Sequence, residues 1–443
     1  MKADVQPIKT KAEQALADAF ASARKTLPSG GGVSEHRQAS FLKFDGEGLP
    51  HRRVEEWKYT DLRTLMRDAK PLASPPDAAA KKRAKNAGRL LGSMGARRLV
   101  FVDGYLVPEL SDLSKLEPGL LIVSMADALA AGDPYIVARL GQIVPNDNMA
   151  VALNTAFMGD GAVIRVVKGA RIERPIHLVF VSASGTSNST FTRSFVVVED
   201  EARATLIESH EGPEAVDYQI NCALELVVGA RAEVDHIKIC TDGAQALHLS
   251  TLMVELGERA TLRDLSFVSG SAVLRNQLFV RFAGENATAQ LAGASLLRGR
   301  QHVDTTLVVD HAVPGGSSRE LFKSVLDDQS RSVFQGKIIV RPGAQKTDGK
   351  MMAKALLLSD DAEANSKPEL EIFADDVQCG HGATAGALDE DLLFYLRARG
   401  IPLKQAEALL IQSFVGEAID TIEQDAVKDA LHAAALAWLH ERA

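Results

Sequence analysis

The chain is 443 residues long, 46% of its residues are apolar, and its formal net charge is −8. This length accommodates two or three domains or one long repeat array, with enough apolar residues for a substantial core. The negative charge offers no overall field for nucleic acid, and no apolar run is long enough to span a membrane, so we expect neither partner. No secretory apolar core follows the first residues, and Glu13 and Asp18 argue against a transit peptide, so we expect a cytoplasmic protein.

Residues 1–140 are predicted to form a helical N-terminal domain. Residues 12–27 follow an amphipathic helical pattern, and residues 53–63 form a charged segment that carries Trp57 and Tyr59. Residues 71–98 are rich in Ala, Pro, Gly and basic residues, which predicts a basic linker or a surface helix. A nucleic-acid patch is disfavoured there because aromatic stacking partners are absent. A further helical stretch is predicted over residues 125–140.

Residues 141–380 are predicted to form an all-β core. From about residue 154 to 373, short runs of Val, Ile, Leu and Thr are separated by Gly, Asn and Asp, which is typical of short strands. A turn residue followed by a small residue and a short strand recurs from Gly169, Glu201, Gly229, Gly257 and Gly284, at intervals of 32, 28, 28 and 27 residues. Such a repeat favours a β-solenoid over a sandwich. The alternative is a chance recurrence in a Gly- and Ala-rich chain.

Residues 381–443 are predicted to form a C-terminal helical domain. Asp389 fits an N-cap, Gly400 fits a helix stop, and Pro402 fits the first turn of the next helix. Two further helices are predicted over residues 403–420 and 426–441. Apolar residues recur there at helical spacing, namely Leu409, Leu410, Phe414, Leu431, Ala435 and Trp438. Such a stripe forms either intramolecular core or a docking face for a partner.

Cys379 and His381 are the strongest candidates for metal chemistry. A thiolate and an imidazole suit zinc, copper or iron–sulfur chemistry, and residues two apart in an extended segment point to the same face. The other cysteines, Cys222 and Cys240, form no CxxC pair, so neither a disulfide framework nor a self-contained site is predicted. Two ligands do not complete a tetrahedral site. A metal here needs ligands from another chain, and the alternative is an inert cysteine beside a surface histidine.

Motifs of common enzymes are absent from the sequence. There is no GxxxxGK[ST] loop, GxSxG elbow or HExxH helix, so we expect no nucleotide hydrolysis by this chain. The alternative function is a stand-alone β-helix enzyme acting on carbohydrate, which would need paired carboxylates. The candidates are Asp304, Asp310, Asp327 and Asp328. An aromatic content of only 5% disfavours this function, because sugar-binding grooves use aromatic stacking.

Six motifs occur in order in the C-terminal part of the chain. They are residues 324–338 (SVLDDQSRSVFQGKI), 345–350 (QKTDGK), 356–360 (LLLSD), 367–372 (KPELEI), 377–384 (VQCGHGAT) and 393–401 (LFYLRARGI). Together they closely resemble the SufB/SufD family of the SUF iron–sulfur cluster assembly machinery. Residues 55–62 (EEWKYTDL) resemble the SufD branch, and so does Gly382, because SufB tends to carry glutamate after the histidine.

The resemblance implies a right-handed parallel β-helix flanked by helical domains. It implies a non-catalytic scaffold subunit that pairs with SufB and with the ABC-type ATPase SufC, which hydrolyses the ATP. A nascent, transient iron–sulfur cluster would form at the SufB–SufD interface, with His381 as a ligand and Cys379 as a weaker candidate, since Gly380 stands where relatives commonly carry serine. SufC docking on the C-terminal helices would use Leu409, Leu410 and Phe414. A flavin in the complex and a homodimer in isolation are compatible with the resemblance, and it assigns no residue to the flavin.

Overall fold

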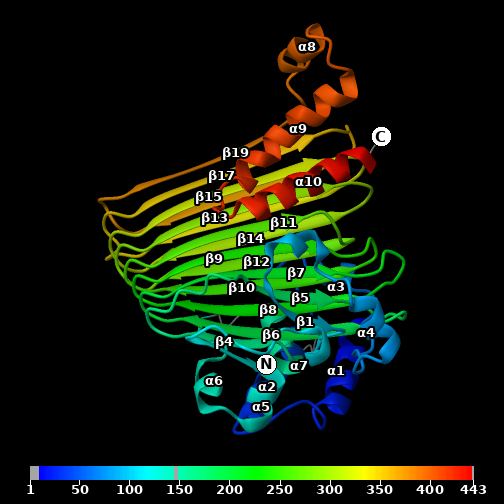
Figure 1. Cartoon of the computed structure of the whole chain (residues 1–443), viewed down its shortest axis with the longest axis vertical. Helices are drawn as coiled ribbons and strands as arrows, with labels where there is room; N and C mark the ends of the chain where they lie inside the picture. The colour runs from blue at the N-terminus through cyan, green and yellow to red at the C-terminus, as the bar shows by residue number, and fades with distance from the viewer. Residues whose placement is uncertain (1–8, 144–147, 442–443) are drawn as a thin grey trace, which may run out of the picture.

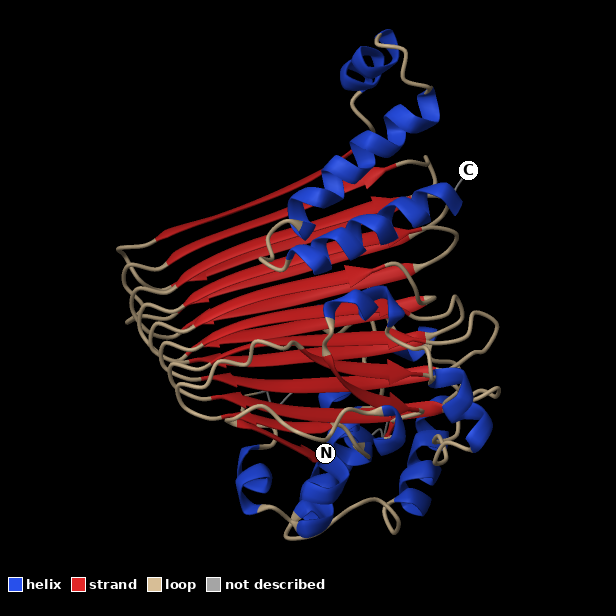
Figure 2. Cartoon of the chain, in the orientation of Figure 1, coloured by secondary structure: helices blue, strands red, loops and turns tan. Residues whose placement is uncertain are grey.

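The protein is a parallel β-solenoid of about eight turns with helices at its N-terminal and C-terminal ends, as predicted (Figures 1 and 2). The computed structural model describes residues 9–143 and 148–441. From β4 onward, consecutive strands lie in different sheets and strands two apart are paired, so each coil contributes one strand to each of two sheets. In the described residues, no helix is both long enough and apolar enough to cross a membrane.

Over residues 9–143 and 148–441, the two sheets contain ten and nine strands. The first sheet consists of β1 (Arg97–Val102), β2 (Tyr105–Leu106), β5 (Ile176–Val181), β7 (Arg203–Glu211), β9 (Glu233–Thr241), β11 (Thr261–Val268), β13 (Thr288–Leu297), β15 (Ser317–Leu326), β17 (Asp348–Leu357) and β19 (Gln378–Gly386). The second sheet consists of β3 (Leu120–Ser124), β4 (Ala162–Val166), β6 (Ser189–Val198), β8 (Gln219–Val228), β10 (Leu247–Leu256), β12 (Val273–Phe282), β14 (His302–His311), β16 (Arg331–Val340) and β18 (Glu363–Ile372). From β4 and β5 onward all pairs are parallel.

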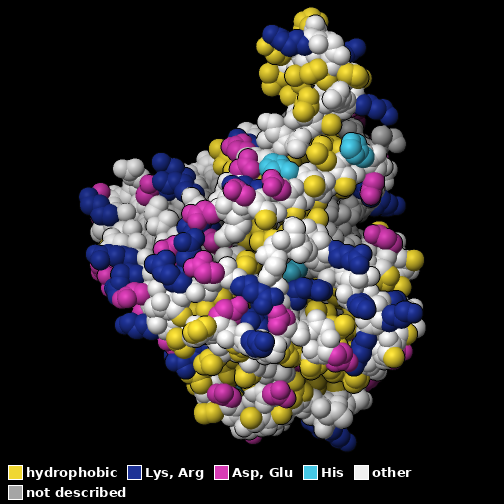
Figure 3. Space-filling model, in the orientation of Figure 1, with side chains coloured by type: hydrophobic (Ala, Val, Ile, Leu, Met, Phe, Trp, Pro, Cys, Tyr) yellow, Lys and Arg dark blue, Asp and Glu magenta, His cyan; other side chains and the backbone are white. Residues whose placement is uncertain are grey.

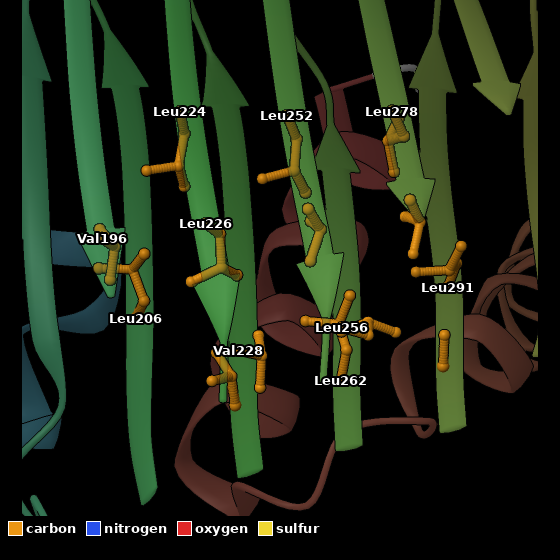
Figure 4. Close-up of a cluster of buried hydrophobic side chains, with 14 of the residues drawn as sticks. Val196, Leu206, Leu224, Leu226, Val228, Leu252, Leu256, Leu262, Leu278 and Leu291 are labelled. Carbon is orange, nitrogen blue, oxygen red and sulfur yellow. The ribbon is translucent and has the colours of Figure 1, made fainter. Parts of the chain in front are cut away.

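Alternate residues of each strand fill the interior between the two sheets. Leu252 on β10 lies opposite Leu224 on β8 and Leu278 on β12, and each of the three is 1% exposed. Figure 4 shows these leucines stacked from coil to coil. Because side chains alternate between the faces of a strand, this register repeats one apolar row through the solenoid. Burying each leucine contributes roughly 2 kcal/mol.

One corner of the solenoid repeats in nearly every coil. The residues with positive φ at this corner are Glu201, Arg231, Arg259 and Asn286. The N–H of Arg231 donates to the carbonyl of Glu258 at 2.7 Å, and the N–H of Arg259 donates to the carbonyl of Glu285 at 2.8 Å. The residue that follows is a buried alanine in each coil, namely Ala202, Ala232, Ala260 and Ala287. The repeated phrase in the sequence therefore marks this corner, where only a small side chain fits inside.

The N-terminal helices are α1 (Lys11–Ala23), α2 (Val33–Glu47), η1 (Glu55–Trp57), α3 (Leu62–Leu65), α4 (Ala78–Ala84), η2 (Arg89–Met94), η3 (Pro108–Leu110), α5 (Met125–Ala131), α6 (Pro134–Arg139) and α7 (Met149–Phe157). Of these, α1, α2, α5, α6 and α7 gather at the end of the solenoid where β4 lies (Figure 1), whereas η2 packs on the outer face of the first sheet. Thr10 and Glu13 form a capping box that starts α1. The basic stretch of residues 71–98 forms α4 and η2, which pack through Ala80, Ala84 and Leu91.

The C-terminal helices are α8 (Glu390–Ala398), α9 (Leu403–Ile419) and α10 (Asp425–Glu441). Asp389 caps α8 through the N–H of Leu392, as the sequence indicates. The solenoid extends beyond the expected division at residue 380, because β19 continues to Gly386. Strands also occur inside the expected helical domain, since β1, β2 and β3 precede residue 140.

The segment around Trp57 fastens the N-terminal region to the outer face of the second sheet. The guanidinium of Arg275 lies 3.9 Å from the centre of the Trp57 ring. Arg275 is fully buried, donates to the carbonyl of Glu56 at 2.6 Å and pairs with Asp304 at 2.5 Å. Removing one member of such a set would leave a buried charge with fewer partners. The EEWKYTDL motif therefore has a structural role, because it connects the N-terminal region to β12 and β14.

We expect Trp57→Ala to lower the denaturation midpoint markedly. The substitution removes a buried ring that covers Arg275, and losses of this kind amount to roughly 3–5 kcal/mol. Urea denaturation followed by circular dichroism measures the effect. Val54→Ala is the control, because Val54 is 38% exposed and should change stability by less than about 0.5 kcal/mol. Equal midpoints for the two variants would contradict the stabilising role of the contact between Trp57 and Arg275.

Candidate functional site

Cys379 and His381 lie on β19, the last strand of the first sheet. Their register partners on β17 are Gly349 and Met351, and Met351 is 2% exposed within the interior core. Since register partners in stacked parallel strands share a face, both side chains are directed toward the end of the solenoid interior. The expectation that the pair shares one face is therefore met. Cys379 is half-buried against the core, and His381 is exposed.

The end of the solenoid formed by β18 and β19, here called the open end, lacks the helical cover of the opposite end. In the part of the chain that the structure describes, β19 pairs only with β17 and β18 only with β16. Ile372 and Phe373 at the end of β18 are 41% and 58% exposed. An unpaired strand edge beside exposed apolar side chains favours contact with another chain.

The surroundings of Cys379 keep its thiol protonated. Burial is the largest cause that raises the pKa of Cys379, and the charges of Asp348 and Glu320 add to it. A hydrogen bond from the backbone N–H of Gly349 acts in the opposite direction. Because the thiolate is the metal ligand, a metal that binds here must displace a proton. Within residues 9–143 and 148–441, neither Cys379 nor His381 belongs to a group of three potential metal ligands.

Glu320 on β15 lies on the same register ladder as His381, two strands deeper in the sheet. Glu320 pairs with Met351, and Met351 pairs with His381. Burial raises the pKa of Glu320 to about 8, despite the smaller opposing effects of Ser318 and Arg319. A protonated carboxyl group therefore lies beneath the ligand pair at neutral pH. No sequence motif marks Glu320, although its alternation with Ser318 and Phe322 indicates the interior face.

The residues expected to dock a partner fall into two groups. Leu409 is 41% exposed, whereas Leu410 and Phe414 are half-buried, and Phe414 lies under Lys323 with the ammonium 4.4 Å from the ring centre. The remaining members of the apolar stripe pack against the outer face of the first sheet; they are Leu431, Ala435 and Trp438. The exposed apolar surface continues instead on α8, where Phe394, Tyr395 and Leu392 are 74%, 52% and 51% exposed.

The carboxylates that a carbohydrate enzyme would need do not form a catalytic pair. Asp304 is buried and pairs with Arg275, and Asp310 pairs with Arg341 at 2.8 Å. Asp304 and Asp310 lie near opposite ends of β14. Asp327 and Asp328 lie in the corner after β15, where Asp328 accepts a hydrogen bond from the N–H of Gly299. Asp327 accepts a hydrogen bond from the N–H of Asp328 at 3.0 Å, so each of the four carboxylates is already held by a group of this chain.

Fold and candidate site together define a class of protein: a helix-flanked parallel β-solenoid with a cysteine and a histidine on the same face of the last strand at its open end. The family described as "SUF system FeS cluster assembly, SufBD core domain" matches residues 180–414, and "SufBD protein N-terminal region" matches residues 10–178. The chain belongs to the SufB/SufD family of iron–sulfur cluster assembly proteins and is SufD-like.

Three relatives illustrate the similarity. The iron–sulfur cluster assembly protein SufD of Escherichia coli is 31% identical, over 86% of this chain and 87% of that protein. The SufBD family protein slr0076 of Synechocystis is 33% identical, over 84% of each chain. The SufD protein of Bacillus subtilis is 24% identical, over 90% of this chain and 94% of that protein. The similarity therefore covers the solenoid and most of the flanking helices.

We expect Glu320→Gln to change the pH dependence of stability. The folded-state pKa of Glu320 is about 8 against a usual value of 4.5, so the folded protein holds this proton more tightly than the unfolded chain. The resulting stabilisation is complete below the unfolded pKa and is lost as the pH rises through the folded pKa. Glutamine does not ionise, so the variant should gain a few kcal/mol over the parent at roughly pH 9 and little at roughly pH 5.

Urea midpoints across this pH range measure the difference. The exposed Glu285→Gln variant is the matched control and should follow the parent at every pH. A Glu320→Gln curve that runs parallel to the parent curve would show that Glu320 does not carry the pH dependence.

Proposed function

We propose that this chain is the SufD subunit of a SUF assembly scaffold and pairs with SufB and SufC to build nascent iron–sulfur clusters. In this proposal the cluster is cargo and forms transiently at the SufB–SufD interface. His381 is the principal ligand from this chain, and Cys379 is the second candidate. The observation that carries the proposal is the position of an incomplete ligand pair on the exposed last strand of the solenoid.

The open end supports pairing with a second subunit. Its strand edges, together with Ile372 and Phe373, offer backbone and apolar contacts to an incoming chain. Cys379 and His381 share the interior face beside these contacts, so ligands from the partner would meet them across the interface. Iron–sulfur clusters prefer thiolate ligands and accept histidine, which matches this pair. An isolated subunit could use the same edges to form a homodimer.

The projecting α8 supports docking of the ATPase. Figure 3 shows hydrophobic side chains gathered on the projecting end of the molecule. Leu403 and Leu409 of α9 are 43% and 41% exposed, so the apolar surface extends from α8 onto α9. In the proposal SufC binds this surface and hydrolyses ATP, while this chain is a non-catalytic scaffold in the cytoplasm. A flavin belongs to the proposal only at the level of the complex, with no residue of this chain assigned to it.

We expect His381→Ala to abolish cluster formation by the assembled complex. The substitution removes an exposed ligand without disturbing the core, so folding and SufC binding should persist. Anaerobic reconstitution with purified SufB and SufC, read by the visible absorbance of the cluster, measures the yield. Cys379→Ser should have a smaller effect than His381→Ala, and the exposed His36→Ala variant is the matched control. An unchanged cluster yield in His381→Ala would refute the assigned role.

We expect the double variant Phe394→Asp and Leu409→Asp to lose SufC. Both side chains are exposed, so the stability of the chain should change by less than about 1 kcal/mol. Burial of a charge in the docking surface should weaken binding at least about tenfold. Co-purification and titration with SufC measure the loss. Leu42→Asp, which alters a 59% exposed leucine on α2, is the control; equal SufC binding by the double variant would place the docking surface elsewhere.

A further inference from the structure

A second group of potential metal ligands lies inside the solenoid, several coils away from Cys379 and His381. The ligand atoms of His210 on β7, Cys222 on β8 and His248 on β10 all lie within 4.8 Å of one another. Cys240 on β9 is the register partner of His210 and forms an overlapping group with Asp242 and His248. All five residues are at most 4% exposed, so the group is enclosed.

Hydrogen bonds fix the orientation of His248 within this group. Its Nδ1 lies 2.8 Å from a carboxylate oxygen of Asp242, and its Nε2 lies 3.2 Å from the Sγ of Cys222. Asp242 is itself held by the hydroxyl of Tyr218 at 3.3 Å. A histidine whose second nitrogen is bonded to a carboxylate is the usual arrangement of a metal-ligating imidazole. His248 therefore directs its other nitrogen, Nε2, at the Sγ of Cys222.

His210 is distinct because its ring takes no part in the hydrogen bonds that link other members of the group. It is fully buried, and neither ring nitrogen has a hydrogen-bond partner in the described residues. Its ring stacks on Phe180 at 4.8 Å and lies 4.7 Å from the ring of His248. A buried imidazole with two unused ring nitrogens is unfavourable unless it binds something.

A neighbouring histidine shows the contrast. His236, also inside the solenoid, has one ring nitrogen 2.6 Å from Asp264 and the other 3.0 Å from Glu208. Both of its nitrogens are satisfied by carboxylates, so His236 needs no ion. Among the described residues, both ring nitrogens of His236 are thus satisfied, whereas neither ring nitrogen of His210 is, next to a thiol and a second imidazole.

We propose that His210, Cys222 and His248 bind a divalent cation of the Zn²⁺ type inside the solenoid, with Asp242 orienting His248 and Cys240 available as a fourth ligand. One thiolate with two imidazoles is a donor set that Zn²⁺ prefers. Metal–sulfur and metal–nitrogen bonds of about 2.3 and 2.0 Å place tetrahedral ligand atoms about 3.5 Å apart, close to the observed Cys222–His248 separation. Binding releases the Cys222 thiol proton, and any proton on His248 Nε2, to solvent.

Cobalt(II) is the probe, because a Co²⁺–thiolate bond has a charge-transfer absorption that reports the sulfur ligand. The full-length chain carrying Cys379→Ser, which removes the partly exposed thiol, is stripped of metal and titrated with Co²⁺. We expect one equivalent to bind with this absorption, and Zn²⁺ to displace it. Absence of the absorption in the folded protein would overturn the proposal.

His210→Phe is the decisive variant, because phenylalanine preserves the stacking on Phe180 and removes the ligand. We expect the metal-free variant to be at least as stable as the parent and to bind Co²⁺ at least about tenfold more weakly. Asp242→Asn should weaken binding about 10- to 100-fold through the orientation of His248. The matched control is His311→Phe, since His311 is buried and stacks on Phe282 at 4.1 Å outside the group.

The outcomes separate a metal site from a structural cluster. Weaker Co²⁺ binding in His210→Phe with unchanged binding in His311→Phe supports the site. Equal Co²⁺ affinities in the parent and in His210→Phe, or equal losses in His210→Phe and His311→Phe, would overturn it.

Discussion

The in-register stacking of coils is the constraint on which the rest of the structure depends. Because the corner at Glu201, Arg231 and Arg259 repeats with the same left-handed conformation and the same hydrogen bond, each coil enters the next strand in the same phase. A slip of one residue would turn every interior side chain outward. The phase set near Glu201 therefore still decides, several coils later, that Cys379 and His381 face the interior side of β19.

The backbone N–H and C=O groups of a solenoid are hydrogen-bonded between coils along its length, but those of the first and last coils lack a partner on one side. One end is closed by antiparallel pairing of β3 with β4 and by the N-terminal helices, whereas β18 and β19 are left with free edges. Helices α9 and α10 do not close the open end, because Ile411, Val415 and Leu431 pack on the outer face of the first sheet. Removing the whole C-terminal region would thus uncover a sheet as well as remove α8. Only point substitutions can therefore alter the exposed apolar surface of α8 without disturbing the packing of α9 and α10 on the sheet.

Sequence patterns reveal the solenoid and the three C-terminal helices because both depend on short-range regularity. The corner phrase recurs once per coil, and Asp389 caps its helix locally. The extent of β19 was not predicted, since residues 379–386 are rich in Gly and Ala and have low strand propensity; pairing with β17 overrides this preference. The apolar stripe on the C-terminal helices was expected to act as a single face. Trp438 is buried in the core whereas Leu409 is exposed, because tertiary packing decides which part of a stripe is covered.

The absence of a CxxC pair led us to expect no complete metal site within this chain. That expectation considered only ligands that are close in sequence. His210 and Cys240 are 30 residues apart in sequence but adjacent in register, so the fold brings together ligands that no local spacing reveals. The two candidate sites then differ in enclosure. The His210 group is enclosed and can retain an ion, whereas Cys379 and His381 are exposed in part and hold too few ligands alone. Under the proposed function that incompleteness favours release of the cargo, because separation from the proposed partner removes the ligands that the partner supplies.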